Sequence, residues 1–222
     1  MPLLSGAYHR TGQFLREERL NLAPATREDR RCCGLCGGYN AVMERDIARI
    51  LIPRDRIQKR VAELARDISE TYDGGSQGLV IVPILAGSII FLADLIRCLP
   101  FKMRIGLITV SRYRGATTQG GESRLLQDLN MDIRDRHVLI LDDIMDTGGT
   151  LRTVIDQMRQ REPASLRVCV LLRKPTKAPK DLKVDFVGFD IEDVFVVGYG
   201  LDYGDHYRNW PDIGVLRPEL YA

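Results

Sequence analysis

Apolar residues recur at helical spacing in three segments of the chain, each bounded by polar or glycine-rich positions. The spacing predicts amphipathic helices over 57–72, 89–99 and 150–161. Pro53 and Asp55 precede the first of them, as start signals do. Asp73-Gly74-Gly75 is expected to end it, because glycine pairs favour turns.

Short apolar segments alternate with these helices. The more continuous ones are typical of strands buried on both faces, and strands are predicted at 79–84, 102–111, 137–141, 166–172, 186–189 and 194–197. Strands that alternate with amphipathic helices indicate an α/β fold, with a mainly parallel twisted sheet flanked by helices. Ligands of such sheets bind beyond the carboxyl ends of the strands, where we therefore expect the chemistry.

Residues 1–42 differ from the remainder, because they show no sustained periodicity and hold many Arg and Glu residues and a glycine-rich patch. Two interpretations stay open: a disordered extension, or sequence upstream of a true start at Met43. The second is favoured, and 43–222 is predicted to be the folded domain. Cys32, Cys33 and Cys36 crowd together here, but a zinc site is not predicted because a second ligand pair is missing.

Composition narrows the class of protein. The 222 residues are 45% hydrophobic and 28% charged, which is enough for a core and argues against general disorder. A formal net charge of +2 gives little support to nucleic acid or an anionic membrane as partner. No apolar run approaches membrane-spanning length, and no export signal is evident, so a cytoplasmic protein is expected. Cys98 and Cys169 lie in apolar runs and are predicted to be buried.

The strongest chemical signal is the segment 138–151. An apolar strand runs into Asp142 and Asp143, Asp146 follows, and the turn Thr147-Gly148-Gly149-Thr150 enters a helix at Leu151. Small residues let backbone amides approach a phosphate, and a helix N-terminus adds favourable partial charge. Carboxylates suit neighbouring sugar hydroxyls, directly or through a hard divalent ion. An acidic helix cap is the alternative, but a cap needs one carboxylate rather than three.

This segment resembles the phosphoribosyl-diphosphate signature of the type I phosphoribosyltransferases, and more closely that of the hypoxanthine-guanine branch. The resemblance covers about residues 44–215 and implies the type I phosphoribosyltransferase fold with a small base-binding hood. The family often has Glu in place of Asp142 and a larger residue in place of Gly149. By resemblance, the ribose and 5′-phosphate are bound by Asp142, Asp143, Asp146, Thr147, Gly148, Gly149, Thr150 and Leu151.

Two further loops match the family. The loop Leu85-Ala86-Gly87-Ser88 is similar to the one that binds diphosphate through backbone amides, which implies diphosphate contacts at Ala86 and Gly87 and a cis peptide between Leu85 and Ala86. Ser111, Arg112 and Tyr113 resemble the start of the flexible catalytic loop, although the family commonly has a Ser-Tyr pair there. A solvated loop over 112–123 is the alternative.

The remaining matched residues concern the base, the metal and the leaving group. The resemblance implies that Lys174 binds the purine oxygen, Phe195 stacks on the ring and the backbone of Val196 reads its edge. Arg208 is assigned to diphosphate, and the Mg²⁺ ligands to Asp142, Asp143 and Asp202. Without the resemblance, Phe195 is an ordinary core aromatic and Lys174 a solvated charge.

Together these residues predict a magnesium-dependent purine-salvage transferase that forms IMP or GMP from hypoxanthine or guanine and phosphoribosyl diphosphate. Asp146 is predicted to be the general base that takes the N7 proton. Lys174 has only donors, which favours a 6-oxopurine over adenine. The resemblance also implies a homodimer or homotetramer. Alternatives are xanthine-guanine or orotate specificity, and a non-catalytic regulator that binds RNA.

Overall fold

The computed structural model describes residues 43–72, 78–112 and 123–221, without the side chains of 111, 112 and 123–126. These residues all fall within one compact unit, Tyr39–Ala222. The segment 1–42, with the three clustered cysteines, lies outside the described residues, and so does Tyr113. Both interpretations of 1–42 therefore stay predictions.

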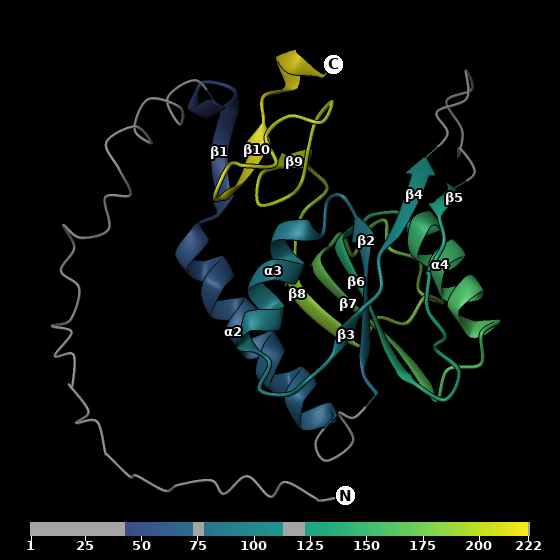
Figure 1. The fold of residues 1–222 in the computed structure, drawn as a ribbon. Coiled ribbons are helices and arrows are strands. Elements are labelled where there is room, and N and C mark those ends of the chain that lie inside the picture. The colour runs from purple at the N-terminus through teal and green to yellow at the C-terminus, as the bar shows by residue number, and fades with distance from the viewer. Residues whose placement is uncertain (1–42, 73–77, 113–122, 222) are drawn as a thin grey trace, which may run out of the picture. The chain divides into compact units, whose positions relative to one another are not determined.

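A mainly parallel sheet forms the centre of the fold (Figure 1). Over the described residues it has seven strands: the path β5-β4-β2-β6-β7-β8, with β3 pairing β2. The only antiparallel pair among them is β4 with β5. The bounds are β2 Val80–Leu85, β3 Arg104–Ile105, β4 Ile108–Arg112, β5 Ser123–Gln127, β6 His137–Met145, β7 Ser165–Arg173 and β8 Phe186–Asp190.

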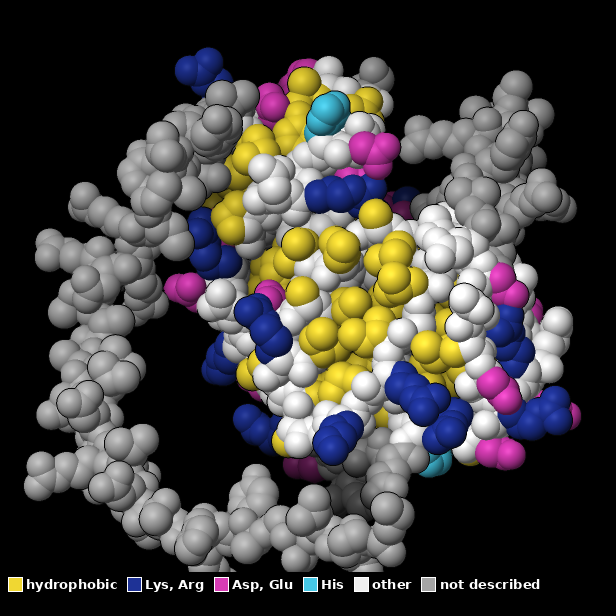
Figure 2. All heavy atoms as spheres, in the orientation of Figure 1, with side chains coloured by type: hydrophobic (Ala, Val, Ile, Leu, Met, Phe, Trp, Pro, Cys, Tyr) yellow, Lys and Arg dark blue, Asp and Glu magenta, His cyan; other side chains and the backbone are white. Residues whose placement is uncertain are grey.

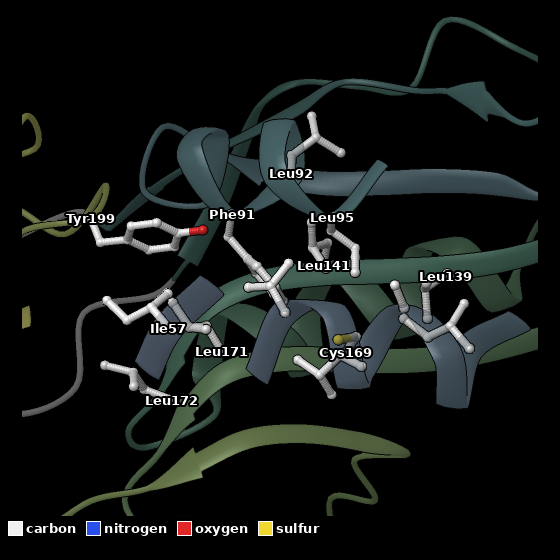
Figure 3. Packing of buried hydrophobic residues seen from close by; sticks show 14 of the residues in the cluster. Ile57, Phe91, Leu92, Leu95, Leu139, Leu141, Cys169, Leu171, Leu172 and Tyr199 are labelled. Carbon is white, nitrogen blue, oxygen red and sulfur yellow. The ribbon is translucent and has the colours of Figure 1, made fainter. Parts of the chain in front are cut away.

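Helices cover both faces of this sheet, as the alternating pattern predicts (Figure 1). α2 (Arg54–Thr71) and α3 (Ile89–Cys98) pack with Leu139 and Leu141 of β6 in one core cluster. α4 (Gly149–Arg159) packs with Val138 and Ile140 in another. Successive side chains of a strand point to opposite faces, so β6 supplies both cores. Figure 3 shows the first cluster, where Phe91 and Leu95 of α3 meet Leu141.

A second, antiparallel sheet has the order β1-β10-β9. β1 (Ile47–Ile52) comes from the start of the described chain, whereas β9 (Val196–Val197) and β10 (Ile213–Leu216) come from its end. Ile47, Val197, Trp210 and Leu216 form a core cluster beneath it. The sequence pattern predicted neither β1 nor β10, and the short helix η1 (Pro218–Leu220) follows them.

Several predicted boundaries are wrong. The strand predicted at 102–111 is two strands, β3 and β4, which pair β2 in one continuous register. The break lies opposite Pro83 of β2. The carbonyl oxygens of Leu79 and Ile81 accept backbone hydrogen bonds from the neighbouring segment that contains β3. Pro83 is the next residue of β2 whose backbone faces that segment, and it has no N–H to donate. β5 was not predicted, and β6 continues beyond residue 141 to Met145.

Cys98 is exposed rather than buried, whereas Cys169 is buried as predicted. Cys98 is the last residue of α3, and Leu99, just beyond the helix, is the residue that turns into the core.

The surface drawn in Figure 2 carries hydrophobic side chains gathered on the face of α3 and β3, with Lys and Arg around them. The exposed large hydrophobics of these elements and of the link to β4 are Ile89, Ile90, Ile105 and Leu107. Among the described helices, none has the length and apolar character needed to cross a membrane.

Candidate functional site

A cavity of about 750 Å³ lies at the carboxyl ends of β2 and β6 and extends to the small sheet. Its wall brings together predicted site residues from four separate parts of the chain: Ala86, Gly87, Asp142, Asp143, Asp146, Thr150, Lys174, Phe195, Val196, Asp202 and Arg208. This is the edge of a parallel sheet at which ligands bind.

Asp142 and Asp143 lie inside β6 rather than after it, because β6 keeps its pairing with β7 as far as Met145 and Arg173. Their side chains therefore leave the strand in opposite directions. Asp142 is only 6% exposed and accepts the backbone N–H of Asp143, while Asp143 accepts that of Ile144. The sequence placed both carboxylates on one loop, and the structure brings them to one cavity from a strand end.

The turn after Asp146 leads directly into α4. Gly148 is the residue before the helix and has φ of +73°, a left-handed conformation that favours glycine. The first amides of a helix lack partners inside it and point outward, where an anion can accept from them. Thr150 lines the cavity, Thr147 in the turn and Gly149 at the first position of α4 are exposed, and Leu151 is buried.

The loop after β2 faces the acids. The peptide between Leu85 and Ala86 is cis, which confirms the expectation from the resemblance. The Ser88 hydroxyl donates to the Ile84 carbonyl oxygen at 2.6 Å and closes the loop before α3 begins. Gly87 sits so close to β6 that a Cβ there would lie 1.8 Å from Asp143 Oδ2. Any side chain at this position would require the carboxylate or the loop to shift.

Lys174 and Asp146 are paired across the cavity wall. Lys174 is 6% exposed, and its Nζ lies 3.3 Å from Asp146 Oδ2. The other oxygen, Asp146 Oδ1, is buried and has no hydrogen-bond partner among the described residues. A buried acceptor without a donor is costly until a ligand supplies one.

Two charged residues that the sequence did not single out complete this pair. Asp193 Oδ1 lies 3.2 Å from Lys174 Nζ and 2.8 Å from Lys177 Nζ. Lys177 Nζ is 3.9 Å from Asp146 Oδ1. The hydrogen bonds from Lys177 and then Lys174 hold the pKa of Asp193 below its usual value, and the bond to Asp193 raises the pKa of Lys177.

Aromatic rings flank the other side of the cavity. Phe195 stacks on Tyr221 with centroids 4.8 Å apart, and Tyr203 meets its edge at 5.6 Å. Val196, which begins β9, is buried and lines the cavity. Phe195 thus precedes β9 as a cavity-lining aromatic, not as a fully buried core residue.

Arg208 and Asp202 are already paired with each other. Arg208 Nη1 lies 2.8 Å from Asp202 Oδ1 and donates to the Gly200 carbonyl oxygen at 2.9 Å. Its second terminal nitrogen donates to Asp205 Oδ1, also at 2.9 Å. The predicted diphosphate ligand and the predicted metal ligand therefore form one unit on the cavity wall.

Ser111 and Arg112 end the part of the chain described before the predicted flexible loop, so their role in that loop stays a prediction. Both belong to β4, where their backbones pair with Arg124 and Ser123 of β5. Thr109 and Val110 of β4 line the cavity. Within the described ranges, no three His, Cys, Asp or Glu side chains lie close enough to hold a metal ion by themselves.

The family model of the phosphoribosyl transferase domain matches residues 53–204 of this chain. The hypoxanthine-guanine phosphoribosyltransferase of Mycobacterium avium is 42% identical over 180 residues, which cover 79% of this chain and 89% of the relative. The hypoxanthine-guanine phosphoribosyltransferase of Bacillus subtilis is 39% identical over 180 residues, which cover 81% of this chain and 99% of that relative.

The comparison with solved structures finds the same family as the comparison of sequences. A crystal structure of a hypoxanthine phosphoribosyltransferase from Staphylococcus aureus superposes with a TM-score of 0.77 at 40% identity, over 82% of this chain and 98% of that one. Likeness at this level extends to the whole fold, which confirms the predicted sheet flanked by helices.

Proposed function

The chain belongs to the phosphoribosyl transferase family, and from this premise we propose that it is the purine-salvage enzyme of the hypoxanthine-guanine type. It converts hypoxanthine or guanine and 5-phosphoribosyl 1-diphosphate into IMP or GMP and diphosphate. The small-molecule substrates bind in the cavity at the carboxyl ends of β2 and β6.

One observation carries the choice of base. Lys174 presents a donor beside Asp146, with its Nζ 3.3 Å from Oδ2, and Asp146 Oδ1 is an acceptor that receives no hydrogen bond from the described residues. A 6-oxopurine carries the matching groups on neighbouring atoms, an acceptor at the C6 oxygen and a donor at N7–H. Adenine has an amino group at C6, which an ammonium with only donors cannot satisfy. The pair therefore fits hypoxanthine or guanine, and Phe195 supplies a ring beside it.

The acids and loops around this pair suit the donor. We assign the ribose hydroxyls to Asp142 and Asp143, and the 5′-phosphate to the turn 146–151 at the N-terminus of α4. The diphosphate is assigned to the backbone of Ala86 and Gly87 and to Arg208. Support comes from their common cavity and from the space that Gly87 leaves at Asp143.

The donor set also fits Mg²⁺. This ion prefers oxygen ligands and commonly binds through one or two carboxylates together with substrate phosphates. Asp142, Asp143 and Asp202 line the cavity, and one or two of them would hold it there together with the diphosphate of the donor. When bound, it would place positive charge beside the leaving group.

The residues that line the cavity have separate roles in the reaction. N9 of the base attacks C1 of the ribose, and the C1–O bond to diphosphate breaks with its electron pair. Arg208 and the amides of the Ala86–Gly87 loop stabilise the negative charge that grows on the leaving group. The N7 proton passes to Asp146, which Lys174 holds in place through Oδ2.

The experiment that tests this function supplies phosphoribosyl diphosphate, Mg²⁺ and one base at a time, and measures the nucleotide formed. Hypoxanthine and guanine are expected to react, with kcat/KM above that of adenine by about 10⁴. Adenine or orotate as the better substrate would reject the proposal. Xanthine in the same series distinguishes the xanthine-guanine alternative, and a gel shift with RNA distinguishes the non-catalytic regulator.

We also propose that the chain acts in the cytoplasm as a homodimer or homotetramer. The exposed side chains Ile89, Ile90, Ile105 and Leu107 support an assembly, because apolar surface of this kind is often covered by another subunit. Light scattering after size-exclusion chromatography measures the mass directly. A mass equal to that of one chain would contradict the proposed assembly.

A further inference from the structure

Asp193 sits at the junction between the main sheet and the small sheet. The Ile191 backbone donates to the Arg173 carbonyl oxygen at 2.8 Å, which ties the segment after β8 to the end of β7. Val194 donates to Glu192, so a tight turn holds Asp193 two residues before Phe195. Its carboxylate thus belongs to the segment that carries the aromatic wall of the cavity.

Asp193, Lys174, Asp146 and Lys177 form a closed ring of alternating charges. Going around it, the nitrogen–oxygen distances are 3.2, 3.3, 3.9 and 2.8 Å. Two carboxylates balance two ammonium groups, so the ring is neutral. Neutrality matters most at Lys174, whose side chain is only 7% exposed, because an unbalanced buried charge is strongly destabilising.

The ring also fixes where the third proton of Lys174 points. An ammonium has three donors, and two of them are used by Asp146 and Asp193. With both carboxylates in place the third donor is left for a ligand in the cavity, which Lys174 lines. Asp193 thus limits the directions that remain for the third donor of Lys174.

Without Asp193, the ring would hold two cations and a single anion. Asp146 would then be the common partner of Lys174 and Lys177, and Lys177 lies 3.9 Å from the very oxygen that has no hydrogen bond. Lys177 would move toward Oδ1 and compete with the N7–H of the purine. The same change would free Lys174 to turn away from the base.

We propose that Asp193 is a positioning residue for base recognition. It orients the Lys174 ammonium toward the C6 oxygen and holds Lys177 away from Asp146. The proposal rests on the function proposed above, and it assigns a role to two residues, Asp193 and Lys177, outside the set matched by resemblance.

The test compares Asp193→Asn with Asp190→Asn. Asp190 is a matched control, because its replacement also removes an ion pair at a strand end. Asp190 Oδ1 lies 2.7 Å from Arg173 Nε, and Asp190 does not line the cavity. For Asp193→Asn we expect KM for hypoxanthine and Kd for GMP to rise about 10- to 100-fold, the range of one charge-assisted hydrogen bond. The affinity for phosphoribosyl diphosphate, which has no base, should stay within about twofold of wild type.

Adding Lys177→Met to Asp193→Asn restores a balanced pair of Lys174 and Asp146, so part of the lost affinity for GMP should return. A purely structural role of Asp193 predicts no such recovery, and it predicts equal losses for GMP and for the donor. Either result, or an Asp193→Asn variant that behaves like Asp190→Asn, overturns the proposal. If wild type neither binds GMP nor forms nucleotide, the proposed function itself fails, which is a different outcome.

Discussion

Asp146 combines two features at the scale of a single residue: one oxygen is hydrogen-bonded by Lys174, and the other accepts no hydrogen bond from the described residues. Replacing it with Asn keeps the shape but removes the proton acceptor. We predict that Asp146→Asn slows turnover by about 10²- to 10⁴-fold while the affinity for phosphoribosyl diphosphate changes little. Steady-state kinetics with hypoxanthine and calorimetry with the donor measure the two quantities.

Asp156→Asn is the control for this variant, because Asp156 is an exposed residue of α4 that pairs with Arg159 away from the cavity. It should turn over like wild type. Equal turnover in Asp146→Asn and Asp156→Asn would remove Asp146 from the role of general base.

Gly87 offers a second test at this scale. A methyl group there would lie 1.8 Å from Asp143 Oδ2, so Gly87→Ala must displace the carboxylate or the loop. We predict a loss of donor affinity of at least tenfold, because Asp143 and the loop amides bind the same ligand. Calorimetry with phosphoribosyl diphosphate checks this. Unchanged donor binding in Gly87→Ala would contradict the assignment.

The residues of the acidic segment could be predicted from the sequence because they form a contiguous motif, in which acids, glycines and threonines follow one another along 142–150. Asp193 and Lys177 carry no such local signal. Their position depends on the ends of β7 and β8 meeting, through the bond from Ile191 to Arg173. Only the folded chain brings Asp193 to Lys174.

At the scale of elements, one hydrogen bond ties the segment after β9 to α3. The hydroxyl of Tyr199 donates to Asp94 Oδ2 at 2.7 Å, and Tyr199 is 6% exposed. Burial, and then the neighbouring Asp94, raise the pKa of the Tyr199 phenol above its usual value of 10.0. A raised pKa means that this contribution to stability is complete below pH 10 and is lost only as the pH rises further.

We therefore predict that Tyr199→Phe lowers the unfolding free energy by about 1–2 kcal/mol, somewhat below the usual contribution of a bond to a charged group, because Asp94 is partly exposed. Urea unfolding at pH 6 and pH 9 should give the same loss. A loss that vanishes at pH 9 would mean that the phenol ionises there, contrary to its surroundings.

The order of elements was largely predictable, since buried strands and amphipathic helices have different periods. β1 and β10 were missed because each depends on the other: Ile47 pairs with Leu216 near the opposite end of the described chain. The carboxyl end of β6 was missed for a similar reason. Pairing with β7 carries the strand through Asp142 and Asp143, whose polar side chains indicate a loop when read alone.

At the scale of the whole molecule, the first residues that the structure describes pack against residues from the end of the chain. The Met43 carbonyl oxygen accepts from the Asp46 amide, and the Met43 side chain packs against the cluster of Ile47, Val197, Trp210 and Leu216. The cavity residues all lie later in the chain. We propose that Met43 begins the folded domain, so a chain that starts there should keep both the small sheet and the site.

A variant that starts at Met43 is expected to match the full chain, within about 0.5 kcal/mol in unfolding free energy and twofold in kcat/KM for hypoxanthine. A variant that starts at Pro53 is the contrast. It lacks β1, and with it the buried side chains Ile47 and Ile52, which leaves β10 with an unpaired edge and removes about 3–6 kcal/mol of burial. That loss approaches the whole stability of an ordinary domain, so the shorter chain should be unfolded or aggregated. If the Met43 variant also fails to fold, residues 1–42 contribute to the domain and the boundary must move toward the N-terminus.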